Sequence, residues 1–401
     1  MNTPSMSSKD SNPFSGLRGL PHLLFASGQT IPNIIGMKEL NAEGYALLHT
    51  NEFKPDRLRA ICSAFRFKEL MRPVKIDAID TQLTEKKIRE ATPALLSASP
   101  AGWVWNFTPG TKQMMIGVMR GLTLDDIQTT PLKGSIYVET GRKGTISLLD
   151  PGCKAPLATK LNPEELLTAQ GILKQGMQQK GISRLIYKLP IDTTLLSPPW
   201  PELSSGIARN LKTYSAEIGR IRATRSSRAG QCRKYLELLK RSGDAGILPD
   251  RFPGTEEEEK NFISFMNGKW LEIYLFRILE EMKRAGDIDD VRWSLEIWKW
   301  DDTDKTYSNS TDLDVVFTQN NNLCHVSCKT ELKKGINDEL LRISSWKRLF
   351  GGAFGRGIIV NLTSRGFHHK SFASELQVGI IQGRDCLEPD VLKQKMLECC
   401  S

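Results

Sequence analysis

The stretch TDLDVVFTQNNNLCHVSCKTE, residues 311–331, predicts two short strands joined by a polar turn. Alternate residues of a strand share a face, so Asp312 and Asp314 point one way on the first strand, and Ser327 and Lys329 point one way on the second. A register that places Asp314 opposite the end of the second strand brings Asp314, Ser327 and Lys329 onto one surface. The apolar residues between them then fill the opposite face of a sheet.

An aspartate beside a lysine suits hydrolysis of a phosphodiester. A divalent cation held by oxygen ligands neutralises charge and lowers the pKa of the attacking water, and Mg²⁺ or Mn²⁺ prefers such ligands. Asp314, the carbonyl of Cys328 and Glu272 are the candidate metal ligands. Lys329 would orient the water or stabilise the developing charge. Ser327 stands where a second carboxylate is expected, and it completes the candidate catalytic set of Asp314, Lys329, Glu272 and Ser327.

The residues around the hairpin predict an α/β core. A long amphipathic helix is expected over 254–286 and a strand over 291–300, ahead of the hairpin. A helix over 337–350 and a strand over 357–362 follow it. Helix, three strands, helix and strand make up a domain in their own right.

Strands and helices also alternate between about residues 20 and 150. Strands are expected at 22–27, 44–50 and 102–108, and a helix at 112–121 follows a Pro-Gly turn. This alternation indicates a parallel sheet with helices on both faces. The chain as a whole is predicted to have four parts: a disordered tail over 1–18, a ligand-sensing domain over 19–155, a helical linker over 156–250, and a nuclease-like domain over 251–401. A winged-helix-like adaptor and a simple strut are the two alternatives for the linker.

The chain has a formal net charge of +9, which favours contact with polyanions such as nucleic acid or nucleotides. Residues 206–241 are its most positive run. A basic helix face in solvent and a surface that contacts nucleic acid both explain this run, and the sequence leaves the two open.

Eight cysteines are scattered without a CxxC pair, so we expect reduced, mostly buried thiols and no structural zinc site. No apolar run reaches about 18 residues and the N-terminus is polar. We therefore expect no membrane span and a cytoplasmic protein.

Two polar loops follow predicted strands in the N-terminal part, SGQTIPN at 27–33 and TPGTK at 108–112. Ligands of open α/β sheets bind outside the carboxyl ends of the strands. The amides at a helix N-terminus favour phosphate, and Lys112 adds a positive charge. An ordinary tight turn with a capping threonine is the alternative for the second loop.

Residues 254–362 resemble the nuclease domain of CRISPR-associated endonucleases, with Glu272, Asp314 and the SCKT segment in the order of the PD-(D/E)XK fold. In that family the second strand typically ends in Glu-Cys-Lys-Thr, so Ser327 replaces the expected carboxylate. Three outcomes are open. The serine holds the metal through a water; another carboxylate substitutes; or the domain binds nucleic acid without cutting it. The candidate substitutes are Glu272, Asp312 and Glu331.

The segments ASGQTIPNIIGMKEL and WNFTPGTKQMMIGV resemble the two signature segments of CARF domains, the Rossmann-like sensors of cyclic oligoadenylate in type III CRISPR immunity. Pro109 replaces a glycine of the second signature and removes a backbone donor. CARF domains pair about one ring ligand, so the resemblance implies a homodimer. It also implies that the ring contacts Ser27, Gln29, Thr30, Asn33, Thr108, Gly110, Thr111 and Lys112.

These resemblances predict a nuclease of type III CRISPR antiviral defence that uses Mn²⁺ or Mg²⁺ and is activated by cyclic oligoadenylate, cyclic tetra-adenylate in particular. It would nick DNA or cleave single-stranded DNA or RNA, with activity reduced or altered by Ser327. One alternative is a catalytically silent, ring-gated binder of nucleic acid. Another is a ring nuclease that degrades its signal in the CARF domain. A phosphate-binding metabolic enzyme is more distant, because no dinucleotide or P-loop motif is present.

Overall fold

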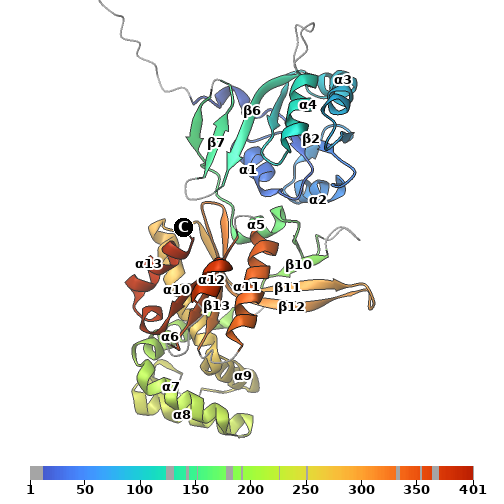
Figure 1. Ribbon diagram of the computed structural model, residues 1–401. Helices are drawn as coiled ribbons and strands as arrows, with labels where there is room; N and C mark the ends of the chain where they lie inside the picture. The colour runs from blue at the N-terminus through green and yellow to red at the C-terminus, as the bar shows by residue number, and fades with distance from the viewer. Residues whose placement is uncertain are drawn as a thin grey trace, which may run out of the picture. The chain divides into compact units, whose positions relative to one another are not determined.

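The computed structural model describes residues 12–122, 131–140, 144–150, 152–177, 184–190, 193–224, 226–249, 252–330, 335–352, 355–363 and 370–400. They belong to two compact units, Met1–Leu185 and Ile186–Ser401 (Figure 1). The four-part functional division expected from the sequence stays a prediction. None of the described helices is long and apolar enough to cross a membrane.

The first unit is built on a mainly parallel sheet. Its strands run in the order β3-β2-β1-β5-β6-β7-β8, with β4 also pairing with β2. Strands β2, β1, β5 and β6 are parallel, and β7 and β8 extend the sheet antiparallel. The strand bounds of this sheet are β1 His22–Phe25, β2 Gly44–His49, β3 Lys68–Glu69, β4 Val74–Lys75, β5 Trp103–Asn106, β6 Leu132–Glu139, β7 Thr145–Leu148 and β8 Lys154–Pro156. Strand β9, Leu173–Lys174, does not belong to it.

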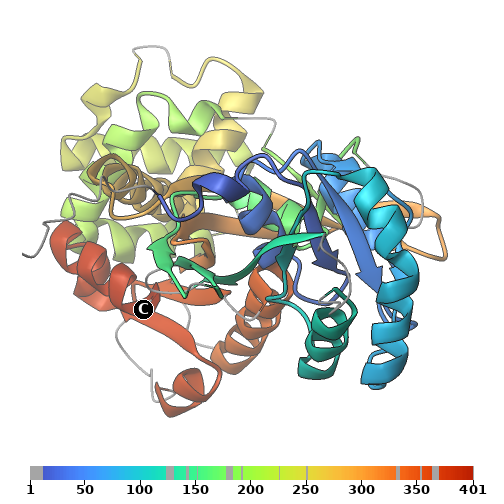
Figure 2. The same cartoon turned by 90° about the horizontal axis from the view of Figure 1, so that it is seen from above.

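Every residue of β1 and β5 is buried, as expected of central parallel strands covered on both faces. The helices are α1 Ile31–Glu39, α2 Asp56–Ala64, α3 Thr81–Ala98, α4 Lys112–Leu122 and α5 Pro163–Ala169. Helices α3 and α4 lie side by side (Figure 2). Two glycines of α4 permit this packing, because a Cβ on Gly117 would lie 2.7 Å from Thr84 and one on Gly121 would lie 2.6 Å from Ile88. The parallel α/β arrangement predicted for this half is confirmed.

The N-terminal segment is more ordered than the sequence predicts. Residues 1–11 lie outside the described residues, but Ser15–Leu17 form a short 3-10 helix. Phe14 and Leu17 are buried, and Leu17 packs beside Gly134 of β6. Two buried apolar side chains thus hold residues 12–18 against the sheet.

A buried histidine gives the first unit a predicted acid sensitivity. His22 on β1 is fully buried, and burial lowers its pKa to about 3 from about 6.5 in the unfolded chain. The folded state keeps His22 neutral, so its contribution is present above about pH 6.5 and is lost as the pH falls towards 3. Between pH 7 and 5, we expect this single group to remove about 2 kcal/mol of stability.

Thermal unfolding tests this contribution. His22→Leu should reduce the loss of stability between pH 7 and pH 5 relative to the unaltered protein. A control that keeps the histidine and removes a different buried group, Thr84→Val on α3, should retain the full loss. Equal losses in His22→Leu and the unaltered chain would contradict the assignment.

The second unit has a mixed sheet in which β15, β14, β13, β12, β11 and β10 are neighbours in that order. Strands β11, β12 and β13 are antiparallel, whereas β13, β14 and β15 are parallel. The bounds are β10 Leu185–Lys188, β11 Asp290–Asp301, β12 Thr306–Gln319, β13 Asn322–Lys329, β14 Arg356–Asn361 and β15 Val378–Gln382. The hairpin predicted from residues 311–331 is therefore present, and its pairing runs from Gln319↔Asn322 to Val315↔Val326.

Helices cover both faces of this sheet. The helices of this unit are α6 Trp200–Arg209, α7 Leu211–Ala223, α8 Arg228–Ser242, α9 Glu256–Ser264, α10 Trp270–Ala285, α11 Ile336–Gly351, α12 Lys370–Glu375 and α13 Pro389–Cys400. Helix α10 shares a core with Val315, Phe317 and Val326, while α11 packs with Ile359 on the opposite face. Alternate residues of a strand thus face opposite sides of the sheet.

One long helix expected from the sequence is divided. The predicted helix 254–286 is interrupted by a π-helical turn at Phe265–Lys269, where Gly268 has a φ of 151°. The basic stretch 206–241 belongs to three helices, α6, α7 and α8, the last of which begins at a Ser227 cap. Their side chains Tyr214 and Tyr235 belong to the same buried core as α10.

All eight cysteines are free, and five of them are buried. The buried ones are Cys62, Cys232, Cys324, Cys386 and Cys400. The prediction of reduced, mostly buried thiols is confirmed.

Candidate active site and sensor edge

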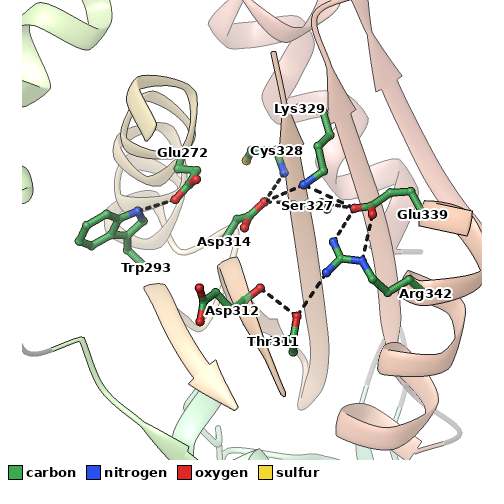
Figure 3. Close-up of polar contacts among 10 residues, drawn as sticks. All are labelled: Glu272, Trp293, Thr311, Asp312, Asp314, Ser327, Cys328, Lys329, Glu339 and Arg342. Carbon is green, nitrogen blue, oxygen red and sulfur yellow. Dashed lines mark hydrogen bonds and ion pairs between the residues drawn. The ribbon is translucent and has the colours of Figure 1, made fainter. Parts of the chain in front are cut away.

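The end of the β12–β13 hairpin places Asp314 beside the second strand. Ladder pairing ends at Val315↔Val326, and the backbone N–H of Cys328 donates to Asp314 Oδ2 at 2.7 Å. Ser327 Oγ lies 3.5 Å from the same oxygen, and Lys329 Nζ lies 3.8 Å from it (Figure 3). The structure therefore brings Asp314, Ser327 and Lys329 together, as the hairpin register predicts.

A carboxylate that sequence reasoning missed completes this cluster. Ser327 Oγ donates to Glu339 Oε1 at 2.6 Å, and Lys329 Nζ lies 3.5 Å from that oxygen. Glu339 belongs to the first turn of α11, the helix that connects β13 to its parallel neighbour β14. Lys329 thus stands between Asp314 and Glu339 (Figure 3). A carboxylate is present beside Ser327, but it comes from a helix and not from the strand.

Arginine holds this glutamate in place. Arg342 donates from Nε to Glu339 Oε2 at 2.9 Å and from Nη2 to Oε1 at 2.6 Å, a bidentate pair one helical turn apart. Burial alone would raise the pKa of Glu339, but the hydrogen bonds from Arg342 and Ser327 and the charge of Lys329 outweigh burial and lower it to about 2. Glu339 is therefore ionised at every pH at which the protein would work.

Glu272 approaches from the other face of the sheet. It lies on α10, and its Oε2 accepts from Trp293 Nε1 at 3.2 Å. Burial, followed by the negative charge of Asp314, raises the pKa of Glu272. Burial likewise raises the pKa of Asp314, against the opposing effect of Lys329. A further positive charge between Glu272 and Asp314 would stabilise the ionised form of both carboxyls.

The other proposed substitute among the described residues, Asp312, makes its hydrogen bond outside the cluster. Asp312 Oδ1 accepts from Asn309 Nδ2 at 3.1 Å, along the extended part of the hairpin. Glu331 lies outside the described residues. No group of three or more histidine, cysteine, aspartate or glutamate side chains in the described part of the chain is arranged to hold a metal ion.

The oxygen donors that are present nevertheless suit a hard cation. Asp314 and Glu339 provide two carboxylates, and the carbonyl of Cys328 remains a candidate ligand. Magnesium commonly uses one or two carboxylates and keeps several waters. The donor set therefore fits Mg²⁺ or Mn²⁺ held by two side chains, with Glu272 as a further anion at the other face.

In the first unit, the two predicted loops lie at the carboxyl ends of β1 and β5, which are paired neighbours. Ser27 and Gln29 form a tight exposed turn, in which the Gln29 N–H donates to Ser27 Oγ at 3.1 Å. Thr111 Oγ1 accepts from the N–H of Met114 at 3.2 Å at the start of α4. Lys112 is exposed beside it. These side chains are placed to meet a ligand at the edge of the sheet.

The other predicted ring contacts are engaged in the fold. Thr30 and Asn33 are buried and donate to the carbonyls of Ala169 and Phe25. Thr108 Oγ1 donates to Asn106 Oδ1 at 2.8 Å and accepts from the Val138 N–H at 2.8 Å. At Gly110, a Cβ would lie 2.6 Å from the ring of Phe25. These four residues shape the loops, and ligand contact by any of the eight predicted residues stays a prediction.

Sequence reasoning missed two features of this edge. Asn106, at the end of β5, links the two loops by donating to the Pro32 carbonyl at 2.9 Å while accepting from Thr108. A cavity of about 430 Å³ beside Ser27 is also lined by Phe53, Lys54 and Arg57 from the segment that follows β2. An aromatic ring and two cations are groups that bind bases and phosphates. Their only signal in the sequence is their position after a predicted strand.

We next compared the chain with models of protein families, with curated proteins and with solved structures. Residues 258–396 match the family model described as "Card1-like, endonuclease domain". The C-terminal unit carries a Card1-like endonuclease domain. No curated protein sequence matches the chain.

Solved structures share the fold of the whole chain. Protein VC1899 from Vibrio cholerae aligns with a TM-score of 0.69 at 14% identity, covering 95% of this chain and 99% of that one. Can2 from Sulfobacillus thermosulfidooxidans, in complex with cyclic tetra-adenylate, gives 0.67 at 17% identity with the same coverage. A type III CRISPR defence DNA nuclease activated by cyclic oligoadenylate gives 0.52 at 19% identity, covering 87% of this chain and 46% of that one.

These likenesses confirm the α/β class predicted for both halves and the resemblance to CRISPR-associated CARF nucleases. The coarser part of the functional prediction, a nuclease, is supported as well, since residues 258–396 match an endonuclease family model.

Proposed function

We propose that this protein is a divalent-metal-dependent nuclease that cyclic oligoadenylate activates in type III CRISPR defence. The contact between Ser327 and Glu339 carries the proposal, because it places an ionised carboxylate where the strand lacks one. The match to the Card1-like domain and the fold shared with ring-activated proteins support it. The silent-binder alternative loses its main support, since the expected negative charge is supplied from α11.

The protein groups divide the chemistry between them. A bound Mg²⁺ or Mn²⁺ would supply positive charge to the phosphate and lower the pKa of the attacking water. Asp314 and Glu339 would hold it, and Arg342 keeps Glu339 ionised and oriented. Lys329 lies within 4 Å of both carboxylates and can stabilise charge that develops on the phosphate. The Cys328 N–H fixes Asp314 through a 2.7 Å hydrogen bond.

Activation would begin in the first unit. Cyclic tetra-adenylate, the ligand bound by Can2, is the proposed activator. Ser27, Gln29, Thr111 and Lys112, with Phe53 and Arg57 of the neighbouring cavity, form the proposed contact surface. A ring ligand shared by two sensor domains calls for a homodimer. Binding would shift the population towards an active arrangement, and the size of the shift would be set by the difference between the ring's affinities for the active and inactive arrangements.

Cleavage assays test the proposal directly. Supercoiled plasmid and single-stranded DNA and RNA should be cut in Mn²⁺ when cyclic tetra-adenylate is added, and not in EDTA. Equal cleavage with and without cyclic tetra-adenylate would contradict activation by the ring. The absence of any cleavage with the ring bound would favour the silent binder. Conversion of labelled ring to linear product would instead favour a ring nuclease.

A second prediction concerns the sensor edge, by which we mean the side chains of Ser27, Gln29, Thr111 and Lys112. Lys112→Glu should weaken cyclic tetra-adenylate binding by about tenfold or more, because it reverses a charge beside the α4 N-terminus. Lys86→Glu makes the same change on an exposed position of α3 and should leave binding unchanged. Calorimetric titration with the ring measures both. Equal affinities for the two variants would exclude this edge as the ring site.

A further inference from the structure

A cavity of about 440 Å³ lies in the second unit beside α7. Thr330 of its lining follows Lys329 directly, and Trp270 precedes Glu272 by two residues on the turn that begins α10. Two lining residues of the cavity are thus chain neighbours of candidate active-site residues. We call it the α7 groove, and its polar and small lining residues are Ser215, Ala216, Gly219, Arg222, Trp270, Thr330 and Thr363.

The α7 groove presents hydrogen-bond donors and positive charge. No carboxylate occurs among the described residues that line it. Arg222 is held there by Asn267, to which its Nε donates at 3.1 Å. Trp270 is 1% exposed, and its indole N–H has no hydrogen-bond partner within the described parts of the chain. A buried donor left unpaired is unfavourable, so the lining suits a ligand rich in acceptor oxygens.

Small side chains keep the groove open along α7. Ser215, Ala216 and Gly219 are exposed, and a Cβ built on Gly219 would meet no atom within 4 Å. An extended ligand can therefore approach the helix backbone closely. This free space also means that a larger side chain at Gly219 would enter the groove without disturbing the core.

The net charge of α7, which lines the groove, and of its chain neighbours α6 and α8 also favours an anion. Residues 206–242 contain ten basic and two acidic residues, a net +8 out of the +9 of the whole chain. Another cavity of the second unit, about 530 Å³ in volume, is lined by Glu257 and Glu258 instead. Of these two spaces, only the α7 groove combines positive charge, unpaired donors and proximity to Lys329.

We propose that the α7 groove binds one strand of the nucleic-acid substrate and leads its phosphodiester backbone to the cluster of Asp314, Lys329 and Glu339. The proposal rests on the nuclease function proposed above. The groove volume falls within the range of about 300–1,000 Å³ that is typical of ligand pockets. The basic run 206–241 is then a substrate surface and not only a solvated helix face.

Binding measured in EDTA separates this inference from catalysis. The probes are fluorescein-labelled dT20 and U20 strands, followed by anisotropy with saturating cyclic tetra-adenylate. Gly219→Glu should weaken binding of the strands by about tenfold, because it fills the groove and pairs with Arg222. Gly219→Lys should retain binding and steepen its salt dependence by about one unit of slope. The matched control is Gly246→Glu, which adds the same charge at an exposed position with open space around it.

A second variant tests the unpaired donor. Trp270→Phe keeps an aromatic ring and removes the N–H. We expect it to weaken binding of the strands by about threefold to tenfold, with the melting temperature of the variant equal to that of the unaltered protein. In cleavage assays Gly219→Glu should raise KM and leave kcat nearly unchanged. Equal binding by Gly219→Glu and Gly246→Glu would overturn the inference, as would tighter binding of duplex than of either single strand. If cleavage is absent but these binding differences hold, the nuclease proposal fails and the groove stands.

Discussion

An Asp314→Asn variant should lose ring-dependent cleavage by about a thousandfold or more. Asp314 accepts the Cys328 N–H at 2.7 Å and lies 3.8 Å from Lys329, so its carboxylate is fixed at the centre of the cluster. Asparagine keeps the shape of the side chain and removes its charge. A cation held by Asp314 and Glu339 would lose one of two anionic ligands.

The control for this experiment is a variant at Asp312, two residues before Asp314 in the chain. Asp312→Asn makes the same chemical change on the same strand, where the carboxylate accepts from Asn309 and not from the cluster. We expect Asp312→Asn to cleave at close to the unaltered rate. Initial rates on single-stranded DNA and RNA and on plasmid, with ring binding checked by calorimetry, separate lost chemistry from lost activation. Unchanged cleavage in Asp314→Asn would place the active site elsewhere.

Glu339→Gln is expected to reduce cleavage by about a hundredfold or more. Glutamine can still accept from Ser327, but it cannot supply the anion, and it leaves Arg342 without its bidentate partner. Asp338→Asn removes a charge from an exposed position one residue earlier in α11 and should have little effect. If Ser327 held the metal through a water without help from α11, the two variants would cleave alike. Rates measured over a series of Mn²⁺ concentrations should also show a higher metal requirement for Glu339→Gln alone.

The hairpin was predictable because its information is local. Alternation in residues 311–331 fixes which side chains share a face, and the register follows once two strands pair across a short turn. The meeting of Asp314, Ser327 and Lys329 therefore follows from sequence periodicity. Their catalytic roles stay predictions until the variants are measured.

Glu339 was not predictable from periodicity, because its position depends on a crossover. The chain leaves β13, enters α11 and returns to β14, and only this path places the first turn of α11 beside Ser327. An acidic residue in the first turn of that helix is the only signal in the sequence, and such residues commonly serve the helix itself. The interruption of the predicted helix 254–286 at Gly268 was likewise not predictable, because the amphipathic pattern continues through this position.

The sensor edge shows the converse limit. The resemblance implies that Thr30, Asn33 and Thr108 contact the ligand, and the structure shows that their side chains also hold the loops through hydrogen bonds. Their contact with a ligand stays a prediction. Polar residues in a signature segment can shape a site without touching its ligand. Only burial and hydrogen-bond partners distinguish the two roles.

Exchanging the two side chains is the most direct test that α11 supplies the missing carboxylate. Ser327→Glu combined with Glu339→Ser returns the carboxylate to the strand and the hydroxyl to the helix, with the total side-chain volume conserved. Ring-dependent initial cleavage rates in Mn²⁺ should be at least about tenfold higher for this double variant than for Glu339→Ser alone. A double variant no more active than Glu339→Ser, or a Glu339→Ser variant as active as the unaltered protein, would contradict the account.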